Sequence, residues 1–194
     1  TSIGDRAFES CSNLTSITIP DGVISIGLAA FETCVSLTSV IIPDSVESIG
    51  KDAFQMCESI ENVVIGSGVS SWGDSAFNQN SSLKNLTIKE GVTCIGRHAF
   101  SNCTSLEGVT IPKSVTELKY GAFVNCTNLS AITFLGNAPI LQPTAVQNIA
   151  DDATVYVTAG ATGFGETFAG LPVVIMEDNE PSNGKGRIVV FGNA

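Results

Sequence analysis

Charged side chains are scarce in this sequence: they make up 14% of the 194 residues, with 9 Lys and Arg and 1 His. Nucleic acids and anionic membranes are bound by clustered Lys and Arg, and the formal net charge is -10, so neither is an expected partner. No stretch approaches the roughly 18 consecutive apolar residues that span a bilayer. The start, Thr1-Ser2-Ile3-Gly4, lacks the basic and apolar regions of a signal peptide. The composition therefore predicts no nucleic-acid partner and no membrane insertion of these residues.

The dominant feature is a repeat of 23 residues. Phe recurs with this step at Phe8, Phe31, Phe54, Phe77, Phe100 and Phe123. An Ala precedes each of them, and Leu or Ile follows at Leu14, Leu37, Ile60, Leu83, Leu106 and Leu129. Because the chain begins in the middle of a unit, we expect the natural protein to extend further toward its N-terminus.

Each unit also contains an apolar alternation that is typical of a strand with one face inward. Its two inward columns are Ile17, Val40, Val63, Leu86, Val109, Ile132 and Ile19, Ile42, Ile65, Ile88, Ile111, Phe134. The return path carries a second apolar wall, with Val23, Val46, Val69, Val92, Val115 and Ile26, Ile49, Trp72, Ile95, Leu118. A degenerate seventh unit continues the register at Leu141, Ala145, Val155 and Val157. The pattern predicts stacked coils that share one core, with Trp72 in the core.

The period fails after this seventh unit. Residues 159–176 contain a Gly-rich turn and the apolar run Val173-Val174-Ile175, which we interpret as a C-terminal cap that closes the core. Residues 177–187 have the composition of a linker, and 188–194 form a short strand or the start of a following region. The predicted organisation is thus repeats over 1–158, with the first unit incomplete, followed by cap, linker and strand.

Written from Leu37, one unit reads Leu-Thr-Ser-Val-Ile-Ile-Pro-Asp-Ser-Val-Glu-Ser-Ile-Gly-Lys-Asp-Ala-Phe-Gln-Met-Cys. This unit resembles the BspA-like subclass of leucine-rich repeats, and the resemblance covers residues 1 to about 158. It implies an α/β, β-rich leucine-rich-repeat solenoid, right-handed, with parallel strands on the concave face and about seven coils of 23 residues. The sequence departs from the pattern at Asn80 for Cys, Gly66 and Lys89 for Pro, and Lys119 for Gly, which predicts local irregularity in coils three to five.

The cysteines invite two interpretations. Five share one column, namely Cys11, Cys34, Cys57, Cys103 and Cys126. Equivalent side chains on coils about 4.8 Å apart project in parallel, whereas a disulfide needs converging Cβ atoms and zinc needs four ligands around a point. We therefore predict buried thiols that donate weakly to a nearby carbonyl, not a disulfide or metal framework. Cys94 lies in a Ser column and is predicted to be partly exposed.

No catalytic set is predicted. His98 shares a column with Ser75 and Asp52, but the order along the stack is Asp, Ser, His, whereas a triad needs the base between nucleophile and carboxylate. His98 is interpreted as a surface histidine beside Arg97. The sequence therefore predicts no enzyme, no cofactor and no metal.

The outward strand positions are the candidate concave binding surface. They are Ser16, Thr18, Ser39, Ile41, Asn62, Val64, Asn85, Thr87, Thr110 and Thr133. Solenoids offer such broad surfaces to partners, yet the same residue types are also simply good strand formers. Charges of alternating sign in the columns Lys51-Asp74-Arg97 and Glu61-Lys84-Glu107, and Glu90 beside Lys113, are predicted to stabilise stacking slightly.

The resemblance implies a secreted or surface-anchored protein of host-associated bacteria or protists, with adhesion or host-protein binding as its role. Our first hypothesis is therefore an extracellular or cell-surface protein-binding module, expected to be a monomer, with a protein partner. The second is a structural spacer that displays another domain.

Overall fold

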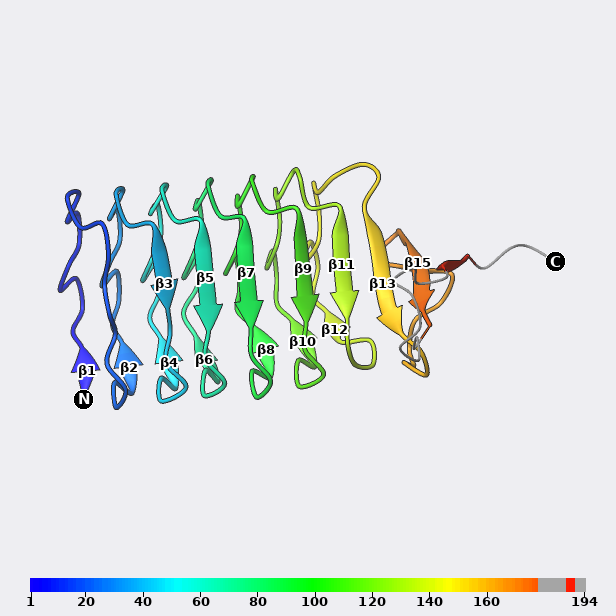
Figure 1. Ribbon diagram of the computed structural model, residues 1–194, viewed down its shortest axis with the longest axis horizontal. Coiled ribbons are helices and arrows are strands. Elements are labelled where there is room, and N and C mark those ends of the chain that lie inside the picture. Colours follow the sequence, from blue (N-terminus) through cyan, green and yellow to red (C-terminus); the bar gives the residue numbers. More distant parts are fainter. Residues whose placement is uncertain (178–187, 191–194) are drawn as a thin grey trace, which may run out of the picture.

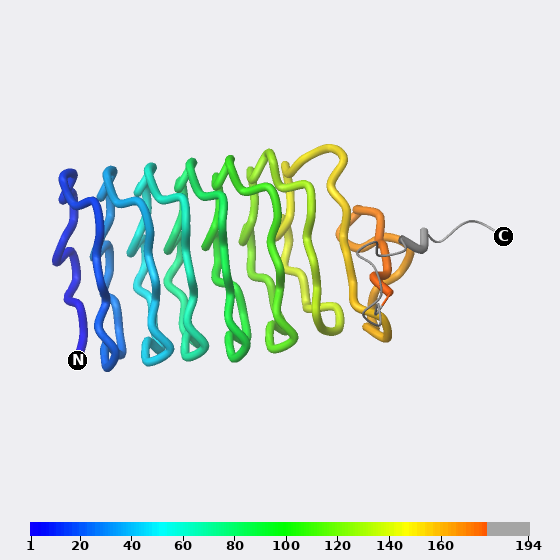
Figure 2. Tube along the Cα trace, in the orientation of Figure 1, coloured from blue at the N-terminus to red at the C-terminus, as the bar shows by residue number. Residues whose placement is uncertain are grey.

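The computed structural model describes residues 1–177 and 188–190 as a single row of stacked coils followed by a C-terminal segment with further strands (Figures 1 and 2). The coils contain only short strands and turns. A solenoid of about seven coils with parallel strands is therefore confirmed.

One wall of the stack carries the longer strands. They are β3 (Ser39–Ile41), β5 (Asn62–Ile65), β7 (Asn85–Ile88), β9 (Gly108–Ile111), β11 (Ala131–Phe134) and β13 (Thr154–Thr158). Adjacent strands pair in parallel, and paired residues are 23 positions apart in the sequence, as predicted. Examples are Val63 with Leu86 and Ile132 with Val155. Buried and exposed residues alternate along β7 and β9, so the inward columns predicted from the alternation are confirmed. We call the outward surface of β3, β5, β7, β9 and β11 and of residues 16–18 the long-strand face.

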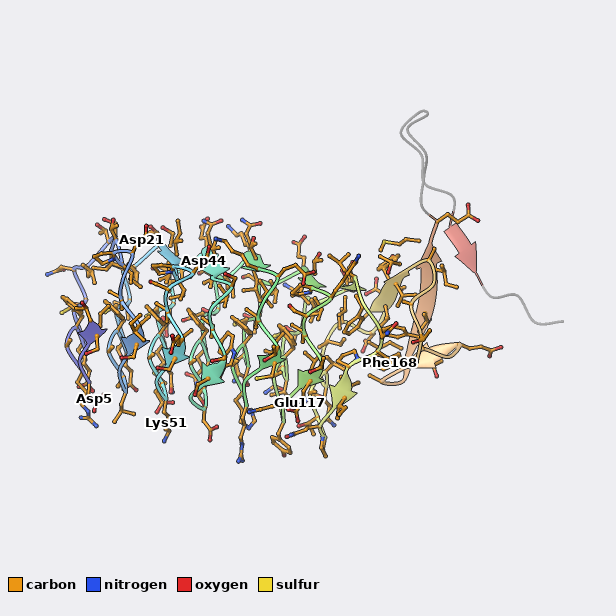
Figure 3. The ribbon with its side chains drawn as sticks, turned by 90° about the horizontal axis from the view of Figure 1, so that it is seen from below. Asp5, Asp21, Asp44, Lys51, Glu117 and Phe168 are labelled. Atoms are coloured by element: carbon orange, nitrogen blue, oxygen red, sulfur yellow. The ribbon has the colours of Figure 1, made fainter. Side chains whose placement is uncertain are left out.

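The opposite wall carries two-residue strands. They are β1 (Ser2–Ile3), β2 (Ser25–Ile26), β4 (Ser48–Ile49), β6 (Ser71–Trp72), β8 (Cys94–Ile95), β10 (Glu117–Leu118) and β12 (Ile140–Leu141). Because both walls are extended chain, they advance by a similar distance per coil, and the row is nearly straight in two perpendicular views (Figures 1 and 3).

The remaining side of each coil is a ladder of turns. Alternate amides bond to the next coil: Phe31 N–H donates to the Ala53 carbonyl over 2.8 Å, whereas Glu32 N–H donates locally to the Ala29 carbonyl. Two residues per coil have left-handed backbone angles, for example Ala29 with φ 51° and Thr33 with φ 59°. A helix needs a continuous right-handed run in which each amide bonds four residues back. The α/β label of the predicted fold class is therefore wrong, since the structure has no helix over the residues it describes.

The core is a stack of aromatic rings with aliphatic columns on either side. Phe31, Phe54 and Phe77 are fully buried, with ring centroids 4.9 and 4.8 Å apart and nearly parallel planes. Phe8 is only partly buried because it lies in the first coil. The predicted row of evenly spaced phenylalanines in a shared interior is confirmed.

The cysteine column behaves as predicted in four of five coils. Cys34, Cys57, Cys103 and Cys126 are buried, and each thiol donates to the carbonyl of a Phe 26 residues earlier, over 3.0–3.5 Å. Cys11 is exposed, so its predicted burial is wrong; in the part of the chain that the structure describes, no coil covers its outer side. Burial raises the pKa of the Cys57 thiol to about 12, which keeps it protonated and unreactive. Cys94 is partly buried, as predicted.

Both strand ladders are interrupted at the same coil boundary. One sheet ends at β6 and another begins at β8, and the long-strand ladder likewise stops at β7 and resumes at β9. Trp72 stands at this boundary in an Ile column, partly buried, with its ring edge against Phe100 at a centroid distance of 5.9 Å. The irregularity predicted for coils three to five from Asn80, Gly66, Lys89 and Lys119 is found at this one boundary, where the backbone of Gly96 lies against the Trp72 side chain.

The C-terminal end of the stack is covered by aromatic side chains. β15 (Leu171–Met176) pairs in parallel with β13 and antiparallel with β14 (Thr167–Phe168). Phe164 and Phe168 both pack on Phe134, at 5.4 and 5.5 Å between ring centroids. β16 (Ile188–Val190) pairs antiparallel with β15. The linker expected at 177–187 lies, except for Glu177, outside the described residues, as do 191–194.

Carboxylates join successive coils where the chain turns away from the long strands. Glu90 accepts hydrogen bonds from the Lys113 and Ser114 amides over 2.9 and 3.1 Å, so it binds the backbone of Lys113. The Lys113 amide, and after it the other contacts of this turn, hold the pKa of the Glu90 carboxyl below its usual range. Folding therefore favours the ionised form of Glu90. Most other links between coils are backbone hydrogen bonds, which do not depend on pH.

Stability is accordingly expected to fall on acidification. A carboxyl whose pKa is lower in the folded state contributes stability above its ordinary value and loses this contribution as pH falls through the folded value. We expect the unfolding free energy, measured with urea at about pH 6 and about pH 3, to drop on acidification, and to drop less in Glu90→Gln. Glu107→Gln is the matched control, because its carboxylate makes no hydrogen bond or ion pair to the described residues. An unchanged pH dependence in Glu90→Gln would contradict this prediction.

Candidate binding surfaces

The structure places the ten predicted surface residues on the long-strand face, in rows across successive coils. Ser39, Ile41, Asn62, Asn85, Thr87 and Thr110 are exposed, whereas Val64 and Thr133 are half-buried. Ser16 and Thr18 are also exposed, but residues 16–18 of the first coil form no strand. Asn85 Nδ2 donates to Asn62 Oδ1 over 2.8 Å, which orders this part of the row.

Two hollows divide these residues into groups. The first hollow has a volume of about 670 Å³ and brings together Ser16, Thr18, Ser39 and Ile41. Ile41 is 63% exposed and lines the hollow together with Ile17 and Pro43, which leaves an apolar patch there. The second hollow, of about 280 Å³, brings together Asn85, Thr87, Thr110 and Thr133 at the interrupted ladder between β7 and β9. Asn62 and Val64 line neither hollow.

The charged residues at the rim of the first hollow were missed by the sequence analysis. Asp21 and Asp44 line it from the turns that follow the outward rows, and Lys89 Nζ reaches Asp44 Oδ1 across 2.9 Å from two coils away. The Ser67 amide, and then Lys89, hold the pKa of the Asp44 carboxyl below its usual range. Lys89 occupies a position that carries Pro in other units, so the departure from the pattern was the available signal.

Of the charge pairs predicted between coils, one is present. Lys84 Nζ lies 3.3 Å from Glu61 Oε1. Lys51 pairs with Asp52 at 3.6 Å instead of Asp74, and the Arg97 guanidinium stacks over the Tyr120 ring at 5.3 Å. The ion pairs predicted along the column of Lys51, Asp74 and Arg97 are therefore wrong, because Lys51 pairs with its neighbour in sequence and Arg97 packs on Tyr120, the next residue of the same column.

The structure keeps Asp52, Ser75 and His98 on successive coils, with Ser75 in the middle position. The His98 ring lies edge-on to Tyr120 at 5.2 Å, and the Asp52 carboxylate is paired with Lys51. Among residues 1–177 and 188–190 there is no cluster of three His, Cys, Asp or Glu side chains that could hold a metal ion. Nor does any helix in these residues have the length and apolarity to cross a membrane.

A third hollow, of about 460 Å³, lies on the turn side of the stack. Three asparagines, Asn78, Asn102 and Asn125, line it. The other large polar or aromatic side chains in the lining are Gln147, His98 and Tyr120. Tyr120 continues the column of Asp5 and Lys51, which lie on the opposite side of the stack from Asp21 and Asp44 at the first hollow (Figure 3).

Comparison with known proteins gives a consistent picture. The model of the BspA type leucine-rich repeat region matches residues 1–134 in six copies. The crystal structure of a leucine-rich repeat protein from T. pallidum is similar, with 28% sequence identity, TM-score 0.60, and coverage of 81% of this chain and 78% of that one. A leucine-rich repeat protein from Bacteroides ovatus shares the fold at 23% identity and TM-score 0.56, over 89% of this chain. The matched part spans 54% of that protein, about half its length. No curated protein sequence matches.

Proposed function

Because this chain belongs to the BspA-type leucine-rich repeat family, we propose that it is a protein-binding module that recognises its partner with the long-strand face. The proposal includes an adhesive role at the cell surface or in secreted form. Repeat stacks of this kind present extended surfaces to other proteins and lack the enclosed, water-excluding clefts that catalysis needs.

The observation that carries the proposal is the exposed Ile41 in the first hollow. Exposed apolar patches rimmed by polar residues mark interaction sites. Here the apolar centre is bordered by Asp21 and by the Asp44–Lys89 ion pair, on the turns that follow the outward rows. This arrangement of an apolar anchor point and a polar rim is typical of protein interfaces. A partner segment with an apolar side chain flanked by polar or basic groups would complement it.

The proposal is tested by measuring binding of the chain to a panel of host extracellular-matrix and cell-surface proteins. We expect at least one to bind, and Ile41→Arg to weaken that binding by about tenfold or more, because a charge would occupy the apolar hollow. Ile140→Arg is the matched control: Ile140 is 70% exposed but lies on β12 of the opposite wall.

Two outcomes would count against the proposal. One is that no protein of the panel binds. The other is that Ile41→Arg, Asn85→Lys and Thr110→Lys all keep every measured binding activity, which is the behaviour expected of a spacer that only displays another domain.

A further inference from the structure

The third hollow, on the turn side, differs in chemical character from the first two, which are lined in part by charged side chains. Its lining contains amides, hydroxyls, one Val, one His and one Tyr, but no carboxylate, Lys or Arg. In a chain with 19 acidic and 9 basic residues, such a hollow offers no charge to an ionic ligand. Its volume of about 460 Å³ falls within the range of small-molecule sites.

Its amide side chains are held in a ladder along the stack. Asn125 Nδ2 donates to Asn102 Oδ1 over 3.0 Å, and Asn102 Nδ2 donates to Asn78 Oδ1 over 2.9 Å. The backbone beneath them is fixed as well, since the amides of Asn102 and Asn125 each bond to the next coil over 2.9 Å. These side chains are therefore ordered before any ligand arrives, which lowers the entropic cost of binding.

The ladder leaves hydrogen-bonding capacity for a ligand. A primary amide has two N–H donors and an oxygen with two lone pairs. To the described residues, Asn125 donates one side-chain hydrogen bond, to Asn102, and accepts one, from Asn148. One donor and one acceptor on the same rigid group remain, and Gln147 adds an exposed amide beside them. A hydroxyl, which both donates and accepts, is the complementary ligand group.

Tyr120 supplies an aromatic ring at the edge of the hollow. The ring is 38% exposed, and it is fixed by the Arg97 guanidinium above it and by the edge-on His98. Gly121 next to it has no side chain, and the space that a Cβ would fill is occupied by the His98 ring. The site thus combines an immobilised aromatic surface with ordered neutral donors and acceptors.

We propose that this hollow binds a neutral carbohydrate, with the exposed part of the Tyr120 ring contacting C–H groups of a sugar ring and Asn102, Asn125 and Gln147 pairing with its hydroxyls. A nucleotide or a sulfated glycan would bring negative charge to a site whose lining has no Lys or Arg and whose neighbouring Arg97 guanidinium is stacked on Tyr120, in a chain of net charge -10. An apolar peptide would leave the amides of the ladder without partners, which costs binding energy. The site lies on the turn side and shares no lining residue with the two hollows of the long-strand face, so it does not depend on protein binding there.

The test is titration of the whole chain with neutral oligosaccharides of hexoses and N-acetylhexosamines, with heparin as the polyanionic comparison, by calorimetry or ligand-observed NMR. We expect at least one neutral oligosaccharide to bind and heparin not to bind. Tyr120→Ala is expected to weaken binding by about tenfold or more, and Tyr120→Phe, which keeps the ring, by about threefold at most. Asn125→Gly should also weaken it, and Gly tolerates the φ of 62° at this position.

Controls separate this site from the long-strand face and from unfolding. Ile41→Arg should leave carbohydrate binding unchanged, and the melting temperature of each variant shows whether it is folded. The proposal is overturned if no neutral oligosaccharide binds, if heparin binds instead, or if folded Tyr120→Ala binds as tightly as the unaltered chain.

Discussion

Phe54→Ala is expected to lower the free energy of unfolding by about 3–5 kcal/mol, the cost of truncating a fully buried Phe. Phe54 is stacked between Phe31 and Phe77, with ring centroids 4.9 and 4.8 Å away. Collapse around the missing ring would require adjacent coils to approach, but hydrogen-bonded ladders on both walls and on the turn side set their spacing. The cavity should therefore persist, which places the loss toward the upper end of this range. Urea denaturation followed by circular dichroism measures it.

Phe8→Ala is the control for this prediction. Phe8 makes the same kind of contact with one neighbour, Phe31 at 5.0 Å, and is only partly buried. Its truncation should cost less than half as much, because fewer contacts are lost and water already reaches the site. Equal losses at the two positions would show that the shared aromatic interior is not what stabilises the stack.

Much of the fold could be predicted because a repeat converts sequence spacing into spatial register. Once Val40 and Val63 are recognised as equivalent, their pairing in adjacent strands follows, and the structure confirms it. The same step carries the register through the degenerate seventh unit, where Phe134 pairs with Val157. The absence of a helix from the residues that the structure describes was harder to predict, because left-handed angles at Ala29 and Thr33 are imposed by bonding between coils and not by residue preference.

The candidate sites were less predictable, for reasons that lie in the side chains. The link from Asn102 to Asn78 spans 24 residues, not 23, so a search along columns does not find the start of the asparagine ladder. Lys89 reaches Asp44 over 45 residues, which no comparison of adjacent units reveals. Ile41 was assigned to the outward row correctly, but its exposure in a hollow depends on how the first coil lies against β3. Backbone register follows from the period, whereas these contacts depend on the reach of individual side chains.

Gly50→Ala is expected to destabilise the fold by about 3 kcal/mol, although it adds a single methyl group. A Cβ at Gly50 would collide with the Gly27 carbonyl group and the Leu28 amide of the preceding coil. These are backbone atoms held in the ladder, so they cannot move aside as the end of a flexible side chain would. The two coils would have to separate locally, which breaks hydrogen bonds such as Gly50 N–H to the Ile26 carbonyl at 2.8 Å.

Gly4→Ala provides the matched control, since Gly4 occupies the same column in the first coil and a Cβ there meets no atom within 4 Å. Without a collision, the smaller entropy of the unfolded chain should leave this variant neutral or more stable by up to about 1 kcal/mol. Both variants can be compared by thermal denaturation. Similar melting temperatures for the two variants would mean that close approach of the coils at this column is not required. Shifts in opposite directions would show that glycine is needed at position 50 for stacking of the coils and not for its backbone freedom.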